Sequence, residues 1–225
     1  MCGIFGFMSK NGRGPDLDLL REIAAVTETR GRHAFGLIWQ TADGGLGTFK
    51  RPGAATDGLD DLGMADDAVI VAGHCRWATH GTPDDNRNNH PHASGNGYIV
   101  HNGVVLNHEE LADQFRLPRT SECDTEVLAR MIAKRPGGVL LRSAWAAERA
   151  EGKLAMLGVW TNRLVLVRNG NPLHFGEAEE GWYFASLATG LPGAKSLKNG
   201  HACLMARNEG RIKISSTDLQ PRLAI

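Results

Sequence analysis

The 225-residue sequence has few cysteines, and the four that it has are far apart. Cys2, Cys75, Cys123 and Cys203 form no CxxC pair, so their spacing disfavours a structural zinc motif and a disulfide scaffold. Such cysteine usage is typical of a protein in a reducing compartment. We therefore expect a cytoplasmic location.

The sequence also lacks an excess of either charge and any long apolar run. Its 25 Lys and Arg residues balance 25 Asp and Glu residues, so its charge does not favour a nucleic-acid partner. No apolar segment approaches the roughly 18–20 residues of a membrane span, and the first residues lack a signal-peptide pattern. We expect neither nucleic acid nor membrane as a partner.

Apolar periodicity predicts strands toward both ends of the chain and helices between them. The first strand is expected at Gly3–Met8 and the first helix at Asp16–Glu28. No linker marks a second domain, so an α+β fold of layered sheets carrying helices is expected as a single domain over residues 1–225. Further helices are expected from Asn107 or His108 to about Phe115, over Asp124–Lys134 and over Val139–Arg149. Further strands are expected at residues 35–40, 46–49, 69–73, 98–101, 154–160, 163–168, 172–175, 182–185, 201–206 and 212–215.

Cys2 follows the initiator Met1, and this position can make it a nucleophile. The simpler explanation is that a small second residue permits removal of Met1. Removal would place an α-amine with a reference pKa of about 7.7–8.0 and a thiol with one of about 8.5 on one residue. The amine can then accept the thiol proton, directly or through water, as in N-terminal-nucleophile enzymes. Cys2 is therefore the first candidate catalytic residue.

Residues 73–81 form an unusually polar segment, Gly-His-Cys-Arg-Trp-Ala-Thr-His-Gly. Arg76 is suited to bidentate binding of a carboxylate. Thr79 and His80 can complete the hydrogen bonds of a ligand. The alternative is a surface loop with an incidental ion pair.

Asn102-Gly103 lies between two apolar runs, where this dipeptide is commonly a hairpin turn. The functional alternative is an oxyanion hole. In it, the Asn102 side-chain amide and the Gly103 N–H would donate to a tetrahedral intermediate.

The segment from Ser121 to Glu126 indicates a helix start, with Ser121, Asp124 or Thr125 as the cap. Asp124 can also bind an ammonium group. Arg76 and Asp124 together would then suit the head group of an α-amino acid.

Six histidines lie between residues 74 and 108, and a metal site is an alternative that they raise. His90-Pro-His92 brings two imidazoles together, but no carboxylate or cysteine stands at an established ligand spacing. Hydrogen-bonding or packing roles are therefore favoured, and no metal is expected. No phosphate-binding glycine loop is present, and no cofactor is expected.

Taken in order, these segments resemble class II glutamine amidotransferases, most closely the glutaminase domain of glucosamine-6-phosphate synthase. The resemblance spans nearly the whole chain and implies an N-terminal-nucleophile hydrolase fold, a four-layer αββα sandwich. Its motifs are Met1-Cys-Gly-Ile-Phe-Gly6, Arg30-Gly31 with Gly36, and residues 74–81, 89–92, 100–108 and 121–127, with weaker similarity at 168–173 and 184–186.

The resemblance also implies a reaction and a set of roles. Cys2 would attack the side-chain amide of L-glutamine and form a glutamyl thioester, releasing ammonia and then glutamate. By matched position, it implies an oxyanion hole at Asn102 and Gly103, head-group binding by Arg76 and Asp124, further substrate contacts from Thr79 and His80, a mobile loop at Trp77 and structural support from Arg30.

Two departures from the family pattern limit this reading. His33 stands where relatives usually carry an acidic residue, so the contacts of that carboxylate are in doubt. The sequence ends at Ile225, before the isomerase domains of a full synthase, so complete synthase activity is not expected. We expect a stand-alone glutaminase that passes ammonia to a separate synthetase subunit. The alternatives are an amide or γ-glutamyl hydrolase without ammonia transfer and a non-enzymatic descendant that binds a partner.

Overall fold

Strands from both ends of the chain form two sheets in the computed structural model, which describes residues 1–208 and 210–220. In spatial order, the first sheet contains β11 (Lys195–Ser196), β9 (His174–Glu177), β10 (Gly181–Ala185), β1 (Gly3–Ser9), β4 (Ala68–Arg76), β2 (Ala34–Thr41) and β3 (Leu46–Pro52). The second contains β13 (Arg211–Asp218), β12 (His201–Asn208), β8 (Arg163–Asn169), β7 (Leu154–Trp160), β6 (Gly97–Gly103) and β5 (His92–Ser94).

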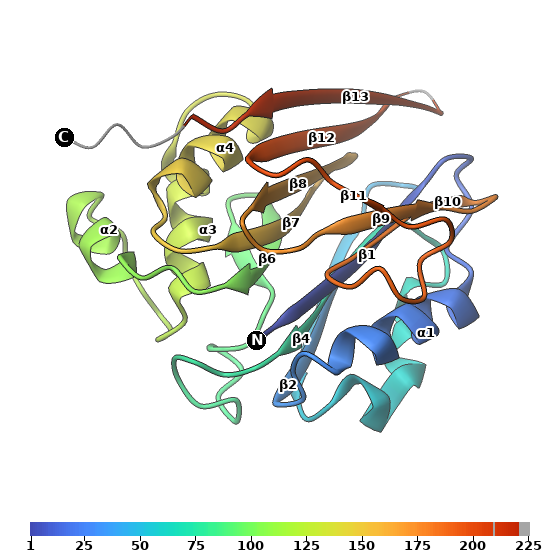
Figure 1. The fold of residues 1–225 in the computed structure, drawn as a ribbon, viewed down its shortest axis with the longest axis horizontal. Helices are drawn as coiled ribbons and strands as arrows, with labels where there is room; N and C mark the ends of the chain where they lie inside the picture. Colours follow the sequence, from blue (N-terminus) through green and yellow to red (C-terminus); the bar gives the residue numbers. More distant parts are fainter. Residues whose placement is uncertain (209, 221–225) are drawn as a thin grey trace.

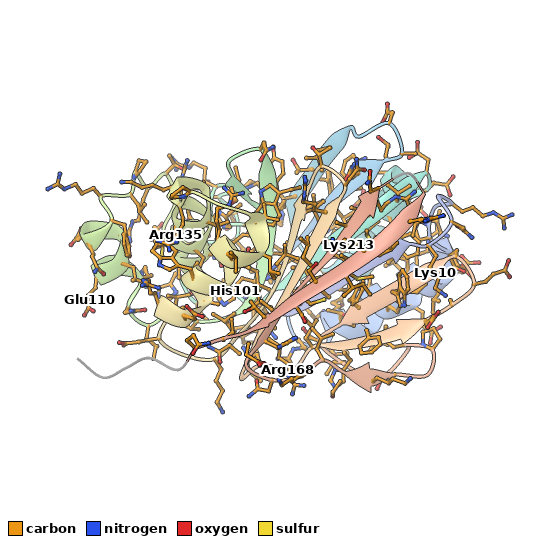
Figure 2. All side chains as sticks on the ribbon, turned by 90° about the horizontal axis from the view of Figure 1, so that it is seen from above. Lys10, His101, Glu110, Arg135, Arg168 and Lys213 are labelled. Carbon is orange, nitrogen blue, oxygen red and sulfur yellow. The ribbon has the colours of Figure 1, made fainter. Side chains whose placement is uncertain are left out.

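Helices cover the outer faces of both sheets and complete four layers (Figure 1). The first sheet carries α1 (Leu17–Glu28) and the 3-10 segment η1 (Ala55–Ala65). The second carries α3 (Asp124–Lys134) and α4 (Val139–Arg149), with α2 (His108–Gln114) packed against α3. The expected four-layer αββα sandwich is thereby confirmed. Lys10 and Glu110 lie at opposite ends of its long axis (Figure 2).

Alternation along β1 shows how one strand serves two apolar layers. Phe5 and Phe7 pack with α1 residues in the cluster on the outer side of the first sheet. Ile4 and Met8 belong to the cluster between the two sheets. Because successive side chains of a strand point to opposite faces, a strand buried on both faces is apolar throughout, as β1 is. A third cluster lies between the second sheet and the helices.

Most predicted elements are confirmed with shifts of a few residues at their ends. The strand expected at residues 172–175 begins instead at His174. The sequence did not predict η1, β5 or β11, which are short or lack a clear apolar period. The hairpin alternative for Asn102-Gly103 is wrong, because these residues end β6 and pair with Ala155 and Leu154 of β7.

The expected side-chain cap of α3 is also wrong. Cys123 occupies the N-cap position, and no side chain caps the helix. The Asp124 carboxylate accepts instead from the Val105 N–H at 2.7 Å. The Glu126 carboxylate reaches back to the backbone N–H groups of Thr120 and Ser121. The helix start is therefore fastened by residues inside its first turn.

Among the described residues, the helices are all too short or too polar to cross a membrane. This agrees with the lack of long apolar runs in the sequence.

Candidate active site

Cys2 lies at the start of β1, where strand register brings it beside the end of β4. Gly3 pairs with Cys75, so the residue before Gly3 comes close to the residues after Cys75. The Cys2 thiol donates to the Trp77 carbonyl at 3.4 Å, and the Trp77 N–H donates to the Cys2 sulfur at 3.3 Å. The Arg30 Nε donates to the Cys2 carbonyl at 2.8 Å. The thiol is thus held by two segments distant in sequence.

An open cavity of about 480 Å³ includes this thiol in its wall, and we call it the nucleophile pocket. Its rim is partly apolar, since Trp77 is 48% and Leu106 70% exposed. Its lining residues are Met1, Cys2, Trp77, Thr79, Asn102, Gly103, Val104, Leu106, Gly152, Lys153 and Asn171.

The pKa of the Cys2 thiol is raised above its ordinary value, chiefly because burial disfavours the charged thiolate. The negative charge of Asp124 acts in the same direction. The Trp77 backbone hydrogen bond, the chain's terminal amine and the Arg76 cation oppose the rise. The thiol form therefore predominates at neutral pH, and nucleophilic attack would require a base.

Asn102 and Gly103 end β6 in the wall of the nucleophile pocket. The Asn102 Nδ2 donates to the Ser186 hydroxyl at 3.4 Å, which leaves the second N–H of this amide for another acceptor. Gly103 has a φ of 151°, and a Cβ there would lie 2.3 Å from the Lys153 carbonyl oxygen. The close approach of β7 therefore requires glycine at this position.

Two further side chains hold this pair in place. The Ser186 hydroxyl also accepts from the Ile4 N–H at 3.0 Å, so it joins β1 to Asn102. The Asn171 Nδ2 donates to the Asn102 carbonyl at 2.9 Å. Because that carbonyl and the Gly103 N–H belong to one planar trans peptide, Asn171 also fixes the direction of the N–H.

Arg76 is buried, and its guanidinium binds the chain's own loop. Its Nη1 donates to the Asn89 Oδ1 at 2.9 Å. Its Nη2 donates to the carbonyls of His80 and Gly81. These bonds close the turn that follows Trp77.

Thr79 lines the nucleophile pocket, whereas His80 does not. The Thr79 hydroxyl contacts the His80 Nδ1 at 3.3 Å, and the His80 ring meets the edge of the His108 ring with centroids 4.9 Å apart. Two of the predicted substrate contacts are therefore neighbours, but only one faces the cavity.

Asp124 is buried at the start of α3 and lies outside the lining of the nucleophile pocket. Its Oδ2 accepts from the Val105 N–H, one residue beyond the pocket residue Val104. Its negative charge adds to the effect of burial, which raises the pKa of the Cys2 thiol. Of the predicted residues, Cys2, Trp77, Thr79, Asn102 and Gly103 thus line one cavity, and its lining does not include Arg30, Arg76, His80 or Asp124.

Residues 53–205 match a family model described as a glutamine amidotransferase domain. The chain belongs to this family. The match covers the Arg76, Asn102 and Asp124 segments, and the family assignment makes the chain a class II glutamine amidotransferase domain with an N-terminal-nucleophile hydrolase fold.

The amidotransferase domain is similar to parts of larger enzymes. It is 34% identical over 189 residues to glutamine–fructose-6-phosphate aminotransferase of Vibrio parahaemolyticus, which is 78% of this chain and 30% of that protein. It is 35% identical over 196 residues to the Aquifex aeolicus enzyme of the same name, covering 83% of this chain and 32% of that protein. The chain thus spans about a third of the length of these relatives.

Solved structures agree on the fold. The Bacillus subtilis glutamine phosphoribosylpyrophosphate amidotransferase, complexed with ADP and GMP, superposes with a TM-score of 0.79 at 22% identity, over 99% of this chain and 50% of that one. A glutamine aminotransferase class-II domain protein from Silicibacter pomeroyi gives 0.66 at 16% identity, over 98% of this chain and all of that one.

The structure adds residues whose contacts the sequence could not predict. Ser186 and Asn171 reach the Asn102 segment from strands and loops near the other end of the chain. The only sequence signal for them was weak family similarity at residues 168–173 and 184–186. His33 accepts from the Ala78 N–H through its Nδ1 at 3.0 Å and stacks on Trp77 with ring centroids 4.6 Å apart.

Proposed function

We propose that this amidotransferase domain hydrolyses L-glutamine to glutamate and ammonia through Cys2, after removal of Met1. The supporting observation is the position of Cys2, which lines the same pocket as Asn102 and Gly103. Its thiol is held there by hydrogen bonds with the Trp77 backbone. Met1 also lines this pocket. Its removal would therefore free the α-amine of Cys2 and widen the cavity at the same time.

The first step is attack of the Cys2 sulfur on the side-chain amide carbon of glutamine. A carbon–sulfur bond forms, the thiol proton passes to the α-amine, and the carbonyl electron pair moves to oxygen. The raised pKa of the thiol makes this base necessary. Collapse of the intermediate breaks the carbon–nitrogen bond, and the amine returns the proton to the departing ammonia. Water then hydrolyses the glutamyl thioester by the same route.

Asn102 and Gly103 would stabilise the oxyanion of both tetrahedral intermediates. Their donors are pre-oriented by Ser186 and Asn171, which supports this role. Donors already aimed at the developing charge need no reorganisation when it forms.

Arg76 and Asp124 would bind the carboxylate and ammonium groups of glutamine. The Arg76 Nη2 donates hydrogen bonds to two loop carbonyls. The carboxylate of glutamine would have to take the place of these carbonyls, and the turn that carries them would move. Thr79 and Trp77, which precede that turn and line the pocket, would then close on the substrate. This proposal ties substrate binding to loop rearrangement.

The decisive experiment compares the mature protein with its Cys2→Ser variant. We expect glutamine turnover to fall by at least about 10³-fold, because a serine hydroxyl is a much weaker nucleophile than the cysteine sulfur. Intact mass should show loss of Met1 and a single adduct from a glutamine-analogue electrophile, absent from the variant. Turnover that does not depend on Cys2 would exclude this mechanism, and preferential turnover of γ-glutamyl conjugates would redirect it to another acyl substrate.

We further propose that the ammonia passes to a separate synthetase subunit. The curated relatives are about three times longer than this chain and carry the name of an aminotransferase. The exposed apolar side chains Trp77 and Leu106 on the rim of the nucleophile pocket, which both remain after removal of Met1, suit a covering partner. The chain alone should release ammonia and glutamate in equal amounts to the solvent. Leu106→Ser should lower stimulation by the partner by a larger factor than it lowers basal turnover, whereas undiminished stimulation would place the partner elsewhere.

A further inference from the structure

His90, His92 and Cys123 form a buried group whose ligand atoms all lie within 4.8 Å of one another. His92 begins β5 and Cys123 is the N-cap of α3, so two separate elements contribute. A tetrahedral zinc site, with Zn–S about 2.3 Å and Zn–N about 2.0–2.1 Å, holds its ligand atoms roughly 3.3–3.8 Å apart. Contraction by about 1 Å would close the group around an ion.

Two nitrogen atoms of this group are buried without a partner. The His90 Nδ1 and the His92 Nε2 make no hydrogen bond within residues 1–208 and 210–220. A buried polar atom that has lost water and gained no partner is unfavourable. A lone pair on neutral imidazole is also the usual histidine ligand for a metal. The two unpaired atoms therefore point to a ligand that accepts electron pairs.

The surroundings of His90 fix its orientation as second-sphere contacts do in metal sites. Its Nε2 lies 2.8 Å from the Thr125 hydroxyl. When Nε2 carries the proton and donates to that oxygen, Nδ1 presents its lone pair. The ring also stacks on His74 with centroids 3.7 Å apart, so little rotation is open to it.

We propose that His90, His92 and Cys123 bind a zinc ion that fastens the start of α3 to β5. Binding replaces the Cys123 thiol proton, which leaves to solvent, by a zinc–sulfur bond. Water completes the coordination, so the Asp124 carboxylate, whose Oδ1 lies 3.7 Å from the Cys123 sulfur, stays outside the ligand set. The spacing of these residues along the sequence argued against a metal site. The third ligand, Cys123, lies close to His90 and His92 only in the folded chain.

Nearby charges of both signs surround the site. The Lys50 ammonium donates to the carbonyls of Asn89 and Pro91, at 3.0 and 3.2 Å, and opposes a cation. The carboxylates of Asp124 and Glu126 begin the same helix as Cys123 and favour one. Because Cys123 directly precedes Asp124, a zinc ion bound to Cys123 would also fix the position of Asp124. Zinc binding does not depend on whether the chain hydrolyses glutamine.

The test is metal binding by the purified full chain. We expect one zinc per chain by elemental analysis after exposure to zinc and exhaustive dialysis. Cobalt loading should give a thiolate-to-cobalt charge-transfer band. Cys123→Ser should weaken zinc binding by more than about 100-fold, since even loss of a second-sphere partner costs about 10–100-fold. Cys203→Ser, which changes a cysteine on β12 that packs against the apolar cluster between the two sheets, should bind zinc as the parent does.

Three results would overturn the proposal. The first is absence of stoichiometric zinc and of the cobalt band in the parent chain. The second is an unchanged affinity in Cys123→Ser. The third is loss of the metal in Cys2→Ser, which would place it at the nucleophile. If Cys123→Ser does not fold, two other measurements test the proposal. Zinc should raise the Tm of the parent, and His92→Asn should weaken zinc binding; the absence of both effects would overturn it.

Discussion

The side chain of His33, at the position where the family resemblance implies an acidic residue, accepts a hydrogen bond as a carboxylate would. Its Nδ1 accepts from the Ala78 N–H at 3.0 Å, and its backbone N–H donates to the Arg76 carbonyl at 2.9 Å. Its ring stacks on Trp77, whose peptide holds the Cys2 thiol. A carboxylate at this position could accept the same hydrogen bond from the Ala78 N–H, but it could not stack on Trp77. We infer that His33 is a positioning residue for Trp77.

Substitution of His33 tests this role. His33→Ala should lower kcat/KM for glutamine by about 10-fold, because one hydrogen bond and one ring contact are lost. His33→Asn, whose side-chain oxygen can accept from Ala78, should recover most of the loss. Steady-state kinetics report the activity, and intrinsic fluorescence, compared with that of a Trp77→Phe variant to isolate one of the five tryptophans, reports the ring contact. Equal activity of the Ala and Asn variants would show that the hydrogen bond is not the cause.

Asn102 provides a second test at a single side chain. Asn102→Ala should lower kcat by about 10²–10³-fold and leave KM within a few-fold, because its amide would act chiefly in the transition state. Ser186→Ala should have a smaller effect, since it removes only the hydroxyl that orients the amide. Circular dichroism controls for folding. A change confined to KM would assign Asn102 to substrate binding instead.

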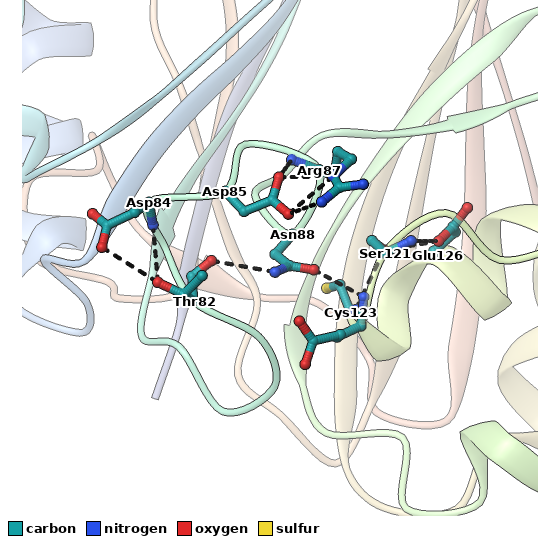
Figure 3. A network of polar contacts seen from close by, with 9 residues as sticks. Thr82, Asp84, Asp85, Arg87, Asn88, Ser121, Cys123 and Glu126 are labelled. Atoms are coloured by element: carbon teal, nitrogen blue, oxygen red, sulfur yellow. Dashed lines mark hydrogen bonds and ion pairs between the residues drawn. The ribbon is translucent and has the colours of Figure 1, made fainter.

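The loop after β4 is joined to the start of α3 by one amide side chain (Figure 3). The Asn88 Nδ2 donates to the Thr82 carbonyl at 3.3 Å, and its Oδ1 accepts from the Glu122 N–H at 2.8 Å. Asn88 is 1% exposed. It therefore connects the turn beyond Trp77 to the helix that begins with Asp124.

Asn88→Ala should break this connection. We expect a loss of about 1–3 kcal/mol in the free energy of unfolding, because two partly buried hydrogen bonds between the Asn88 side chain and the backbone are lost. Hydrogen exchange should increase in residues 79–89 and 120–123. Arg87→Ala is the matched control, since its exposed side chain pairs with nearby Asp85 in the same loop, and we expect a change within about 0.5 kcal/mol. Equal effects of the two variants would assign no special role to Asn88.

Elements with an unbroken apolar period were predictable from the sequence, and contacts between distant segments were not. The strands β1 and β7 and the helices α3 and α4 follow from side-chain periodicity alone. The segment η1 has a non-helical kink at Gly58, so its apolar residues follow no single period. β5 and β11 have three and two residues and are too short to show alternation.

The candidate site divides in the same way. Cys2 and the Asn102-Gly103 pair carry their chemistry in the residue types and were predictable. The contacts of Ser186 depend on the pairing of β1 with β10, which joins opposite ends of the chain. Cys123 approaches His90 and His92 only after α3 packs on β5. Such proximities come from tertiary packing, which no local pattern encodes.

The sandwich places the candidate site where the start of β1 meets the end of β6. β1 lies between β10 and β4, and β6 faces it from the other sheet. The same packing buries the Cys75 thiol completely. Cys75 on β4 pairs with Gly3 of β1, the residue that follows Cys2. All four cysteines are free thiols, so the pH dependence of stability carries a contribution from buried sulfur.

Burial raises the pKa of the Cys75 thiol far above its ordinary value, with the Glu28 charge adding to the effect. The unfolded chain releases this proton above about pH 8.5, whereas the folded chain retains it. The folded state then binds more protons, so stability falls as pH rises beyond that point, by about 1.4 kcal/mol per unit. Below about pH 8.5 both states hold the proton, and the contribution is constant. Urea unfolding of the parent and Cys75→Ala between pH 7 and 10.5 measures the effect. The variant should lose this part of the slope, whatever its stability at pH 7, and parallel curves above pH 9 would show that Cys75 titrates alike in both states.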